Sequence, residues 1–316
     1  MSHDLPHRLV IAVASSALVD QRESNRVYRE EGLPAYRKHQ IEREEEILPK
    51  GQAFAFVERL LGLNAIAPEL KPVDVILLSR NTADTGLRIF NSIEHYKLPL
   101  SRAAFCGGRD PFTYMTQFNA KLFLSANAED VRVAVAAGFP AGQILESGAP
   151  AAEVDAELRL AFDFDGVLAD DSSERVFREE QLSGFLSHEE RLRQLPHAPG
   201  PLKPFLDGLA QIQKLEEQRV AQDPSYRPLL RTAIVTARAA PAHKRVIHSL
   251  RFWGLSVDEI FFLGGIDKGR IMSQFRPHIF FDDQLCHLDS TRAFAPSVHI
   301  PFGVANLGSV NAPLGS

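Results

Sequence analysis

Two copies of one pattern run through the chain, and they constrain its fold more than any other feature of the sequence. Arg26–Glu31 recurs as Arg175–Glu180, an offset of 149 residues, and Arg88–Ile93 recurs as Arg245–Leu250, an offset of 157. Several matches held in register indicate an internal duplication. Each copy is about 150 residues long, too long for a solenoid repeat, so each is expected to be a complete structural unit.

Apolar strands alternate with helical patterns in both copies. In the first copy strands are predicted at 10–19, 73–78, 102–105 and 121–124, and helices at 24–39, 53–63, 85–95 and 111–118. In the second copy strands are predicted at 158–168, 232–235, 261–263 and 279–281, with a loose tail from Pro296 onward. This alternation predicts an α/β fold of Rossmann-like parallel sheets with crossover helices.

The duplication sets the expected domain boundary. Residues 1–150 form the first copy and residues 151–316 the second. Residues 8–19 imitate the apolar core of a signal peptide. Because this run is the counterpart of 158–168, we interpret it as the first strand of a folded domain.

Composition excludes some functions. The chain has 316 residues, a net charge of −5 and a pI near 6.1, so it lacks the basic excess of a nucleic-acid binder. Cys106 and Cys286 lie far apart without a C-x-x-C spacing, which argues against a disulfide framework or a zinc site. No stretch reaches the roughly 18 apolar residues of a membrane span. We therefore expect a cytoplasmic protein without nucleic-acid or membrane partners.

The stretch Leu158–Asp170 is the first candidate for chemistry. Its apolar run ends in Asp163 and Asp165, followed by Gly166. Past the end of a strand the chain can curl, so both carboxylates can reach one point, and glycine permits the turn. Ligands of α/β sheets collect at the carboxyl ends of strands. Alone, the two acids would more often belong to a polar turn, in which aspartate caps and turns.

Further candidate residues follow three more strands of the second copy. Thr236 and Ala237 follow one predicted strand, and Asp282 and Asp283 follow another. Lys268 comes shortly after the third, at the start of a predicted helix that Asp267 can cap. A lysine in the first turn is disfavoured by the helix dipole, which suggests that an anion compensates for it.

The first copy lacks these charges. Asp163 and Asp165 align with Ala14 and Ser16, Lys268 aligns with Pro111, and Asp282 and Asp283 align with Ser125 and Ala126. The second copy is therefore the catalytic candidate, and the first is a degenerate copy without the catalytic acids.

The ordered set Asp163-x-Asp165, Thr236, Lys268 and Asp282-Asp283 resembles the four motifs of the haloacid dehalogenase superfamily of phosphohydrolases. Over roughly residues 8–303 the chain also resembles the cytosolic 5′-nucleotidase type I family. The stretches that carry this second resemblance are 79–81, 85–96, 103–108, 235–238, 240–243 and 261–269. In the superfamily a glycine often separates the two acids, and here Phe164 stands between them.

The resemblance implies hydrolysis of a phosphate monoester through a covalent aspartyl-phosphate. Asp163 would be the nucleophile, and Asp165 would protonate the leaving oxygen and then activate water. Thr236 and Lys268 would bind and neutralise the phosphoryl oxygens. Mg²⁺, a hard cation with oxygen ligands, fits the acids. The expected ligands are Asp163, the carbonyl of Asp165 and Asp282, with Asp283 binding through water or orienting Lys268.

Residues 170–231 are too long for an ordinary crossover and carry two helical patterns, which predicts a helical cap insert over the site. We expect Thr236, Ala237 and, from the family signature, Phe177, Arg88 and Asn91 to bind substrate. Arg238, His243 and His287 are left outside the catalytic set, because a lone histidine is more often structural or exposed. The insert of the first copy, about 21–71, could pack on the cap or form a subunit contact, so a homo-oligomer stays open.

The sequence thus predicts a Mg²⁺-dependent 5′-nucleotidase acting on nucleoside 5′-monophosphates of the AMP, IMP or deoxynucleotide type. It does not rank the bases or sugars. The alternatives are a phosphosugar phosphatase of the same superfamily and a non-catalytic nucleotide-binding or scaffold protein. Binding of a regulatory nucleotide in the degenerate copy is a further hypothesis.

Overall fold

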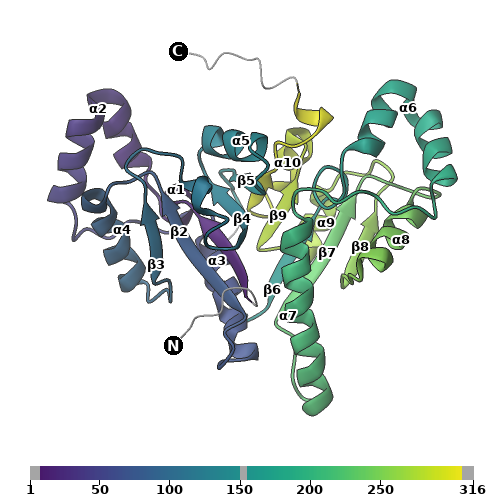
Figure 1. Ribbon diagram of the computed structural model, residues 1–316, viewed down its shortest axis with the longest axis horizontal. Helices are drawn as coiled ribbons and strands as arrows, with labels where there is room; N and C mark the ends of the chain where they lie inside the picture. The colour runs from purple at the N-terminus through teal and green to yellow at the C-terminus, as the bar shows by residue number, and fades with distance from the viewer. Residues whose placement is uncertain (1–7, 150–154, 308–316) are drawn as a thin grey trace. The chain divides into compact units, whose positions relative to one another are not determined.

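The computed structural model describes residues 8–149 and 155–307 (Figure 1). The chain divides into unit 1 (Met1–Ile144) and unit 2 (Leu145–Ser316). The sequence placed this boundary between residues 150 and 151. Both units pair parallel strands with helices, so the α/β fold class is confirmed.

Unit 1 is built on a sheet with the strand order β3-β2-β1-β4-β5. Its strands are β1 (Leu9–Val13), β2 (Val73–Ser79), β3 (Arg102–Phe105), β4 (Ala120–Ser125) and β5 (Ala141–Ile144). Its helices are α1 (Ser15–Leu18), α2 (Arg22–Glu42), α3 (Phe54–Gly62), α4 (Ala83–His95) and α5 (Ala128–Ala136), with 3₁₀ turns η2 (Leu63–Ile66) and η3 (Pro111–Tyr114).

Unit 2 has the corresponding order β8-β7-β6-β9-β10. Its strands are β6 (Leu158–Phe162), β7 (Leu230–Thr236), β8 (Glu259–Phe262), β9 (Ile279–Asp282) and β10 (Ser297–His299). Its helices are α6 (Ser172–Arg191), α7 (Lys203–Gln222), α8 (His243–Trp253), α9 (Gly269–Phe275) and α10 (Leu285–Thr291), with the 3₁₀ turn η4 (Val304–Asn306).

The strand registers confirm the internal duplication. In unit 1 Leu9 pairs with Val73, and in unit 2 Leu158 pairs with Leu230. These two pairs are related by the offsets of 149 and 157 residues that the sequence repeats show. The pairing of β2 with β3 recurs 157 residues later as the pairing of β7 with β8.

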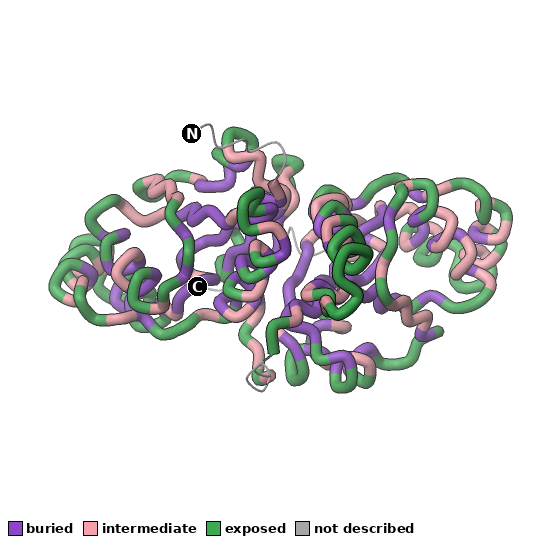
Figure 2. Tube along the Cα trace, turned by 90° about the horizontal axis from the view of Figure 1, so that it is seen from below, coloured by how far each residue is buried: buried purple, intermediate pink, exposed green. Residues whose placement is uncertain are grey.

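The central strands of each unit are buried and the helices cover them (Figure 2). All residues of β1 and β6 are buried, as expected for strands packed on both faces of a parallel sheet. One apolar cluster of unit 1 contains Val10, Ile76 and Phe123, and the matching cluster of unit 2 contains Ala161, Ala233 and Phe280. Each unit therefore has its own core.

Several local predictions were wrong. The strand predicted at 158–168 ends at Phe162, because the chain turns after Asp163. The first strand ends at Val13, because residues 15–18 turn into α1, and a continuous apolar run does not distinguish a strand from a buried helix. The helix predicted at 111–118 is only the short turn η3. The tail predicted from Pro296 onward begins with β10, whose Val298 is buried and pairs with Phe281. Residues 308–316 of that tail lie outside the described residues.

The structure narrows the predicted cap insert of residues 170–231. The second helix, α7, packs on the sheet and is not part of a cap. Its buried Phe205 contacts Phe162 and Phe281, with ring centroids 6.1 and 6.0 Å away. Only α6 remains as an insert, and it arches away from the strands of its unit (Figure 1). It bends at Gln181, and α2 bends at the equivalent Gly32.

Candidate active site

The carboxyl end of β6 delivers the first acid of the candidate site. Asp163 continues the ladder through its backbone N–H, which donates to Phe281 O at 2.8 Å, and its side chain is almost fully buried. Oδ1 accepts a hydrogen bond from Phe164 N at 2.7 Å, which leaves Oδ2 facing Lys268. The chain then turns at Gly166, whose φ of +70° is a conformation that glycine adopts without strain.

Lys268 lies between two carboxylates. Its Nζ is 3.0 Å from Asp163 Oδ2 and 2.7 Å from Asp282 Oδ2, and the side chain is 3% exposed. Burial lowers the pKa of this amine, but the two carboxylates outweigh burial, so the pKa of Lys268 lies above its usual value. The lysine is therefore charged. The anions that compensate for its place at the start of α9 are carboxylates of the protein itself.

Asp282 orients the lysine. Its Oδ1 accepts a hydrogen bond from Gln284 N at 2.8 Å and lies 3.2 Å from Nδ1 of His287, while Oδ2 accepts from Lys268. Burial raises the pKa of Asp282, but Lys268 and His287 lower it by more, so the pKa lies below its usual value. This carboxylate is therefore ionised and fully occupied.

Asp283, unlike Asp282, has a carboxylate oxygen without a hydrogen bond to the described part of the chain. Its Oδ1 is buried and has no hydrogen-bond partner among the described residues. Burial and the charges of Asp163 and Asp282 raise the pKa of Asp283 to about 9. A Cβ placed on Gly166 would lie 2.4 Å from Asp283 Oδ2, so only glycine lets this carboxylate approach the loop so closely.

These acids fit a cation. Ligand atoms of Asp163, Asp282 and His287 lie within 4.8 Å of one another. Burial raises the pKa of Asp163 to about 7, with Lys268 opposing and Asp282 adding to the effect. A buried carboxyl group with a raised pKa and an orphaned oxygen such as Asp283 Oδ1 are both relieved by a positive ion.

Thr236 ends β7, the strand next to β6, and is buried. Its hydroxyl accepts a hydrogen bond from Arg238 N at 3.3 Å, and Ala237 between them is exposed. Thr236 thus lies at the same edge of the sheet as Asp163.

The structure brings together a second cluster around Asp165 that the sequence reasoning left out. Nε and Nη2 of Arg238 donate to Oδ2 and Oδ1 of Asp165, both at 2.6 Å. Arg238 also pairs through Nη1 with Glu189 of α6, which is fully buried. Burial raises the pKa of Glu189, but contacts with His197 and Arg238 dominate and hold it well below its usual value. The offset of 149 pairs Glu189 with the neutral Gln40, and this difference is the signal that could have found it.

The three predicted substrate residues that do not follow strands are on helices. Arg88 and Asn91 are on α4 of unit 1, where Arg88 donates to Glu46 O and to Gln40 Oε1, and Asn91 donates to Glu44 O. These bonds hold the chain after α2 against α4. Phe177 of α6 is 40% exposed and packs edge-on against Phe185, with ring centroids 6.0 Å apart.

None of the helices within residues 8–149 and 155–307 combines the length and apolar character needed to cross a membrane. A search of solved structures found one weak similarity. A haloacid dehalogenase-like hydrolase from Burkholderia xenovorans LB400 aligns with 51% of this chain and 90% of its own, at 14% identity and a TM-score of 0.26, too low to support an argument.

Two sequence comparisons identify the family of the chain. The chain is 37% identical over 290 residues to the Homo sapiens protein named cytosolic 5′-nucleotidase 1B. That match covers 90% of this chain and 47% of the human protein, so the chain spans just under half the length of this relative. A model of the 5′-nucleotidase family matches residues 1–307. The chain belongs to the 5′-nucleotidase family.

Proposed function

We propose that unit 2 hydrolyses nucleoside 5′-monophosphates to nucleoside and phosphate through an aspartyl-phosphate. The observation that carries this proposal is the contact of Asp163 with Lys268 at the carboxyl end of β6, in a chain of the 5′-nucleotidase family. The lysine is charged and buried, so it can neutralise a phosphate group brought against the carboxylate. AMP, IMP and deoxynucleotide monophosphates are the proposed substrate class.

In the first step an oxygen of Asp163 attacks phosphorus, and the bond from phosphorus to the ribose 5′ oxygen breaks. Asp165, which takes up a proton from solvent before this step, gives that proton to the ribose oxygen, so a neutral nucleoside leaves. In the second step water attacks the aspartyl-phosphate, Asp165 takes a proton from the water, and the bond from phosphorus to Asp163 breaks. Phosphate leaves, and both aspartates return to their starting state.

The two steps need groups that hold the phosphoryl oxygens. Lys268 would contact them directly, because its Nζ already lies 3.0 Å from Asp163 Oδ2. The Thr236 hydroxyl and the backbone near exposed Ala237 would bind the same oxygens from the neighbouring strand end. Asp282 keeps the lysine in place through its 2.7 Å contact.

Mg²⁺ is the proposed cofactor. Asp163 and Asp283 would hold it with the carbonyl of Asp165, since Asp283 Oδ1 lies buried at this site without a hydrogen-bond partner among the described residues. Both oxygens of Asp282 are engaged by Lys268, Gln284 and His287, so Asp282 serves the lysine first. When bound, Mg²⁺ offsets negative charge on the phosphate and the acids. A cytoplasmic location, which the name of the human relative suggests, belongs to the same proposal.

The test is release of phosphate from a panel of nucleoside monophosphates and sugar phosphates, with Mg²⁺ or with a chelator. Wild type is compared with Asp163→Asn and with the control Asp207→Asn, a partly exposed acid on α7 that pairs with Lys203. We expect metal-dependent turnover of nucleotides that Asp163→Asn abolishes and Asp207→Asn retains. Preferred turnover of sugar phosphates would replace the substrate class, and binding of nucleotides without turnover would overturn the catalytic proposal.

A further inference from the structure

A buried ion cluster connects the acid Asp165 to the inserted helix α6. Arg238 is 4% exposed, and its fork contacts both oxygens of Asp165 at 2.6 Å. On its other side Arg238 pairs with Glu189, which Arg245 also contacts at 2.8 Å. His197 Nε2 lies 3.0 Å from Nη2 of Arg238. Two guanidinium groups thus balance two carboxylates.

Aromatic rings fix the plane of the guanidinium. Its Cζ lies 5.6 Å from the ring centroid of Phe164 and 5.3 Å from that of Phe185 on α6. Phe164 is fully buried and stacks on Trp253, with centroids 6.1 Å apart and an interplanar angle of 25°. A guanidinium packed against rings keeps a defined plane and can present its two donors in one direction, which is the geometry of a bidentate contact.

Unit 1 contains the same framework without the ion cluster. Ser24 donates to Gln40 at 3.1 Å and Arg88 to Gln40 at 3.0 Å. In unit 2 the equivalent contacts are Ser173 to Glu189 and Arg245 to Glu189, both at 2.8 Å. Asn81 stands where unit 2 has Arg238.

Neither the charge of Glu189 nor that of Arg238 is therefore needed to build this corner of the fold. Buried ion pairs contribute little net stability against their cost of desolvation, so their retention calls for another reason. The pair occurs in the copy that has Asp165 and is absent from the copy that has Ser16 at the aligned position.

We infer that Arg238 and Glu189 are positioning residues for Asp165: they hold its carboxyl group at the leaving oxygen and tie that position to α6. This inference rests on the proposed hydrolysis of nucleoside monophosphates. Glu189 anchors the fork of Arg238 from the α6 side, and Arg238 sets the orientation of Asp165. Neither side chain needs to touch the substrate.

The expected variants follow from this division of roles. Arg238→Lys keeps a positive charge but loses the bidentate fork. Glu189→Gln is isosteric, and it introduces the residue that unit 1 carries at the same position, so the variant is expected to fold. Glu179→Gln makes the same chemical change on an exposed face of α6 and is the matched control.

The test uses the chemistry of the leaving group. A nucleoside leaves as a poor alkoxide and needs the proton of Asp165, whereas p-nitrophenolate leaves without one. Rapid-quench kinetics would measure formation of the phosphoenzyme from AMP and from p-nitrophenyl phosphate, in the presence of Mg²⁺. We expect Arg238→Lys and Glu189→Gln to slow the AMP step by about tenfold or more. The p-nitrophenol burst should stay within about twofold of wild type, as should both steps in Glu179→Gln.

Equal slowing with both substrates in Glu189→Gln would overturn the inference, because a general disturbance of the site affects both reactions alike. An unchanged AMP step in both variants would also overturn it. Failure of the proposed function is distinguishable, because wild type itself would then release neither nucleoside nor p-nitrophenol, and the inference would fall with it.

Discussion

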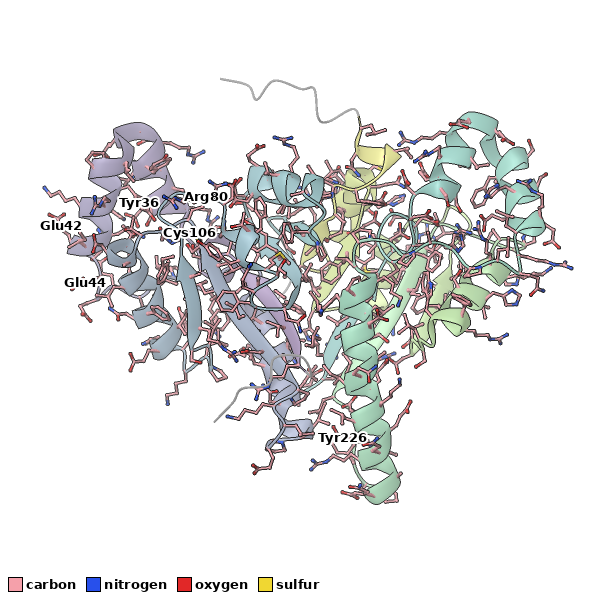
Figure 3. All side chains as sticks on the ribbon, in the orientation of Figure 1. Tyr36, Glu42, Glu44, Arg80, Cys106 and Tyr226 are labelled. Atoms are coloured by element: carbon pink, nitrogen blue, oxygen red, sulfur yellow. The ribbon has the colours of Figure 1, made fainter. Side chains whose placement is uncertain are left out.

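Unit 1 and unit 2 share strand order and register but differ at the carboxyl ends of their strands. In unit 2 these ends carry the buried charges of Asp163, Lys268 and Asp282. In unit 1 the positions after β1 and β2 carry a neutral network: Ser15 Oγ lies 2.9 Å from Ser79 Oγ, and Asn81 donates to both. The neighbouring Arg80 points instead to Asp110 and Asp130, with which it forms ion pairs. Tyr36, labelled with Arg80 in Figure 3, donates to Asn81 at 2.5 Å.

The difference separates what builds the fold from what serves the chemistry. Unit 1 has its own apolar core and a satisfied hydrogen-bond network at its strand ends, so the architecture stands without the acids. Unit 2 buries several ionised groups at a cost in desolvation. The proposed site for a phosphate and a cation accounts for the cluster of Asp163, Lys268 and Asp282, which unit 1 lacks.

The largest expected effect comes from exchanging the nucleophile between copies. Asp163→Asn should lower phosphate release by at least about a thousandfold, because Asp163 is the proposed nucleophile that forms the covalent intermediate. The mirror substitution Ala14→Asp should leave activity in place and destabilise unit 1 by about 3 kcal/mol, since it buries a carboxylate without a lysine partner. Phosphate assays and urea unfolding would measure these effects. Retained activity in Asp163→Asn would break the comparison.

The second prediction concerns Lys268. Lys268→Met leaves Asp163 and Asp282 buried without their cation, so we expect loss of activity and a loss of about 3 kcal/mol in the free energy of unfolding at pH 8. The loss should be smaller at pH 5, where the pair can take up a proton. Urea unfolding at both pH values measures it. An unchanged unfolding midpoint at pH 8 would show that the lysine does not compensate for the acids.

The third prediction is a pH dependence of the metal-free protein. The folded-state pKa values of Asp163 and Asp283, about 7 and about 9, lie above the usual 3.8 of an aspartate. The folded state therefore binds more protons than the unfolded state, and the free energy of unfolding falls as pH rises from about 4 to 9. Thermal unfolding should show this fall, and both Mg²⁺ and Asp283→Asn should reduce it. A metal-free protein that becomes more stable between pH 6 and 9 would contradict the assignment.

The smallest expected effect lies at the bend of the two inserts. Gln181 has φ +58° and ψ −167°, and its counterpart Gly32 has φ +83° and ψ −178°. This region is strained for any residue except glycine. Gln181→Gly should stabilise the protein by about 1 kcal/mol, and Gly32→Gln should destabilise it by a similar amount. Matched thermal unfolding of the two variants would decide, and a reversal of either sign would show that the bends differ in origin.

The fold could be predicted well from the sequence, because the duplication gives two aligned sequence patterns for the same strand or helix. The motif at Asp163 and the pairs Thr236–Ala237 and Asp282–Asp283 were visible because each follows a buried strand. Elements with weak periodicity were missed, such as β10, because three buried residues carry too little pattern.

The cluster of Arg238 and Glu189 was missed for a different reason. The partners are 49 residues apart, and only packing of α6 onto the strand ends brings them together. Likewise, the resemblance placed Asp282 on the metal and Asp283 beside Lys268, and the proposal exchanges these roles. The reason is which carboxylate oxygen finds a partner, and the sequence does not show that.

The most direct test of the difference between the copies is to trap the covalent intermediate. The full-length protein would be mixed with Mg²⁺ and a ³²P-labelled nucleoside monophosphate, quenched in acid and cleaved into peptides. We predict label on the peptide that contains Asp163, none on peptides of unit 1, and none anywhere in Asp163→Asn. Label on a unit 1 peptide, or rapid phosphate release with no trapped label in wild type and normal release by Asp163→Asn, would contradict the account.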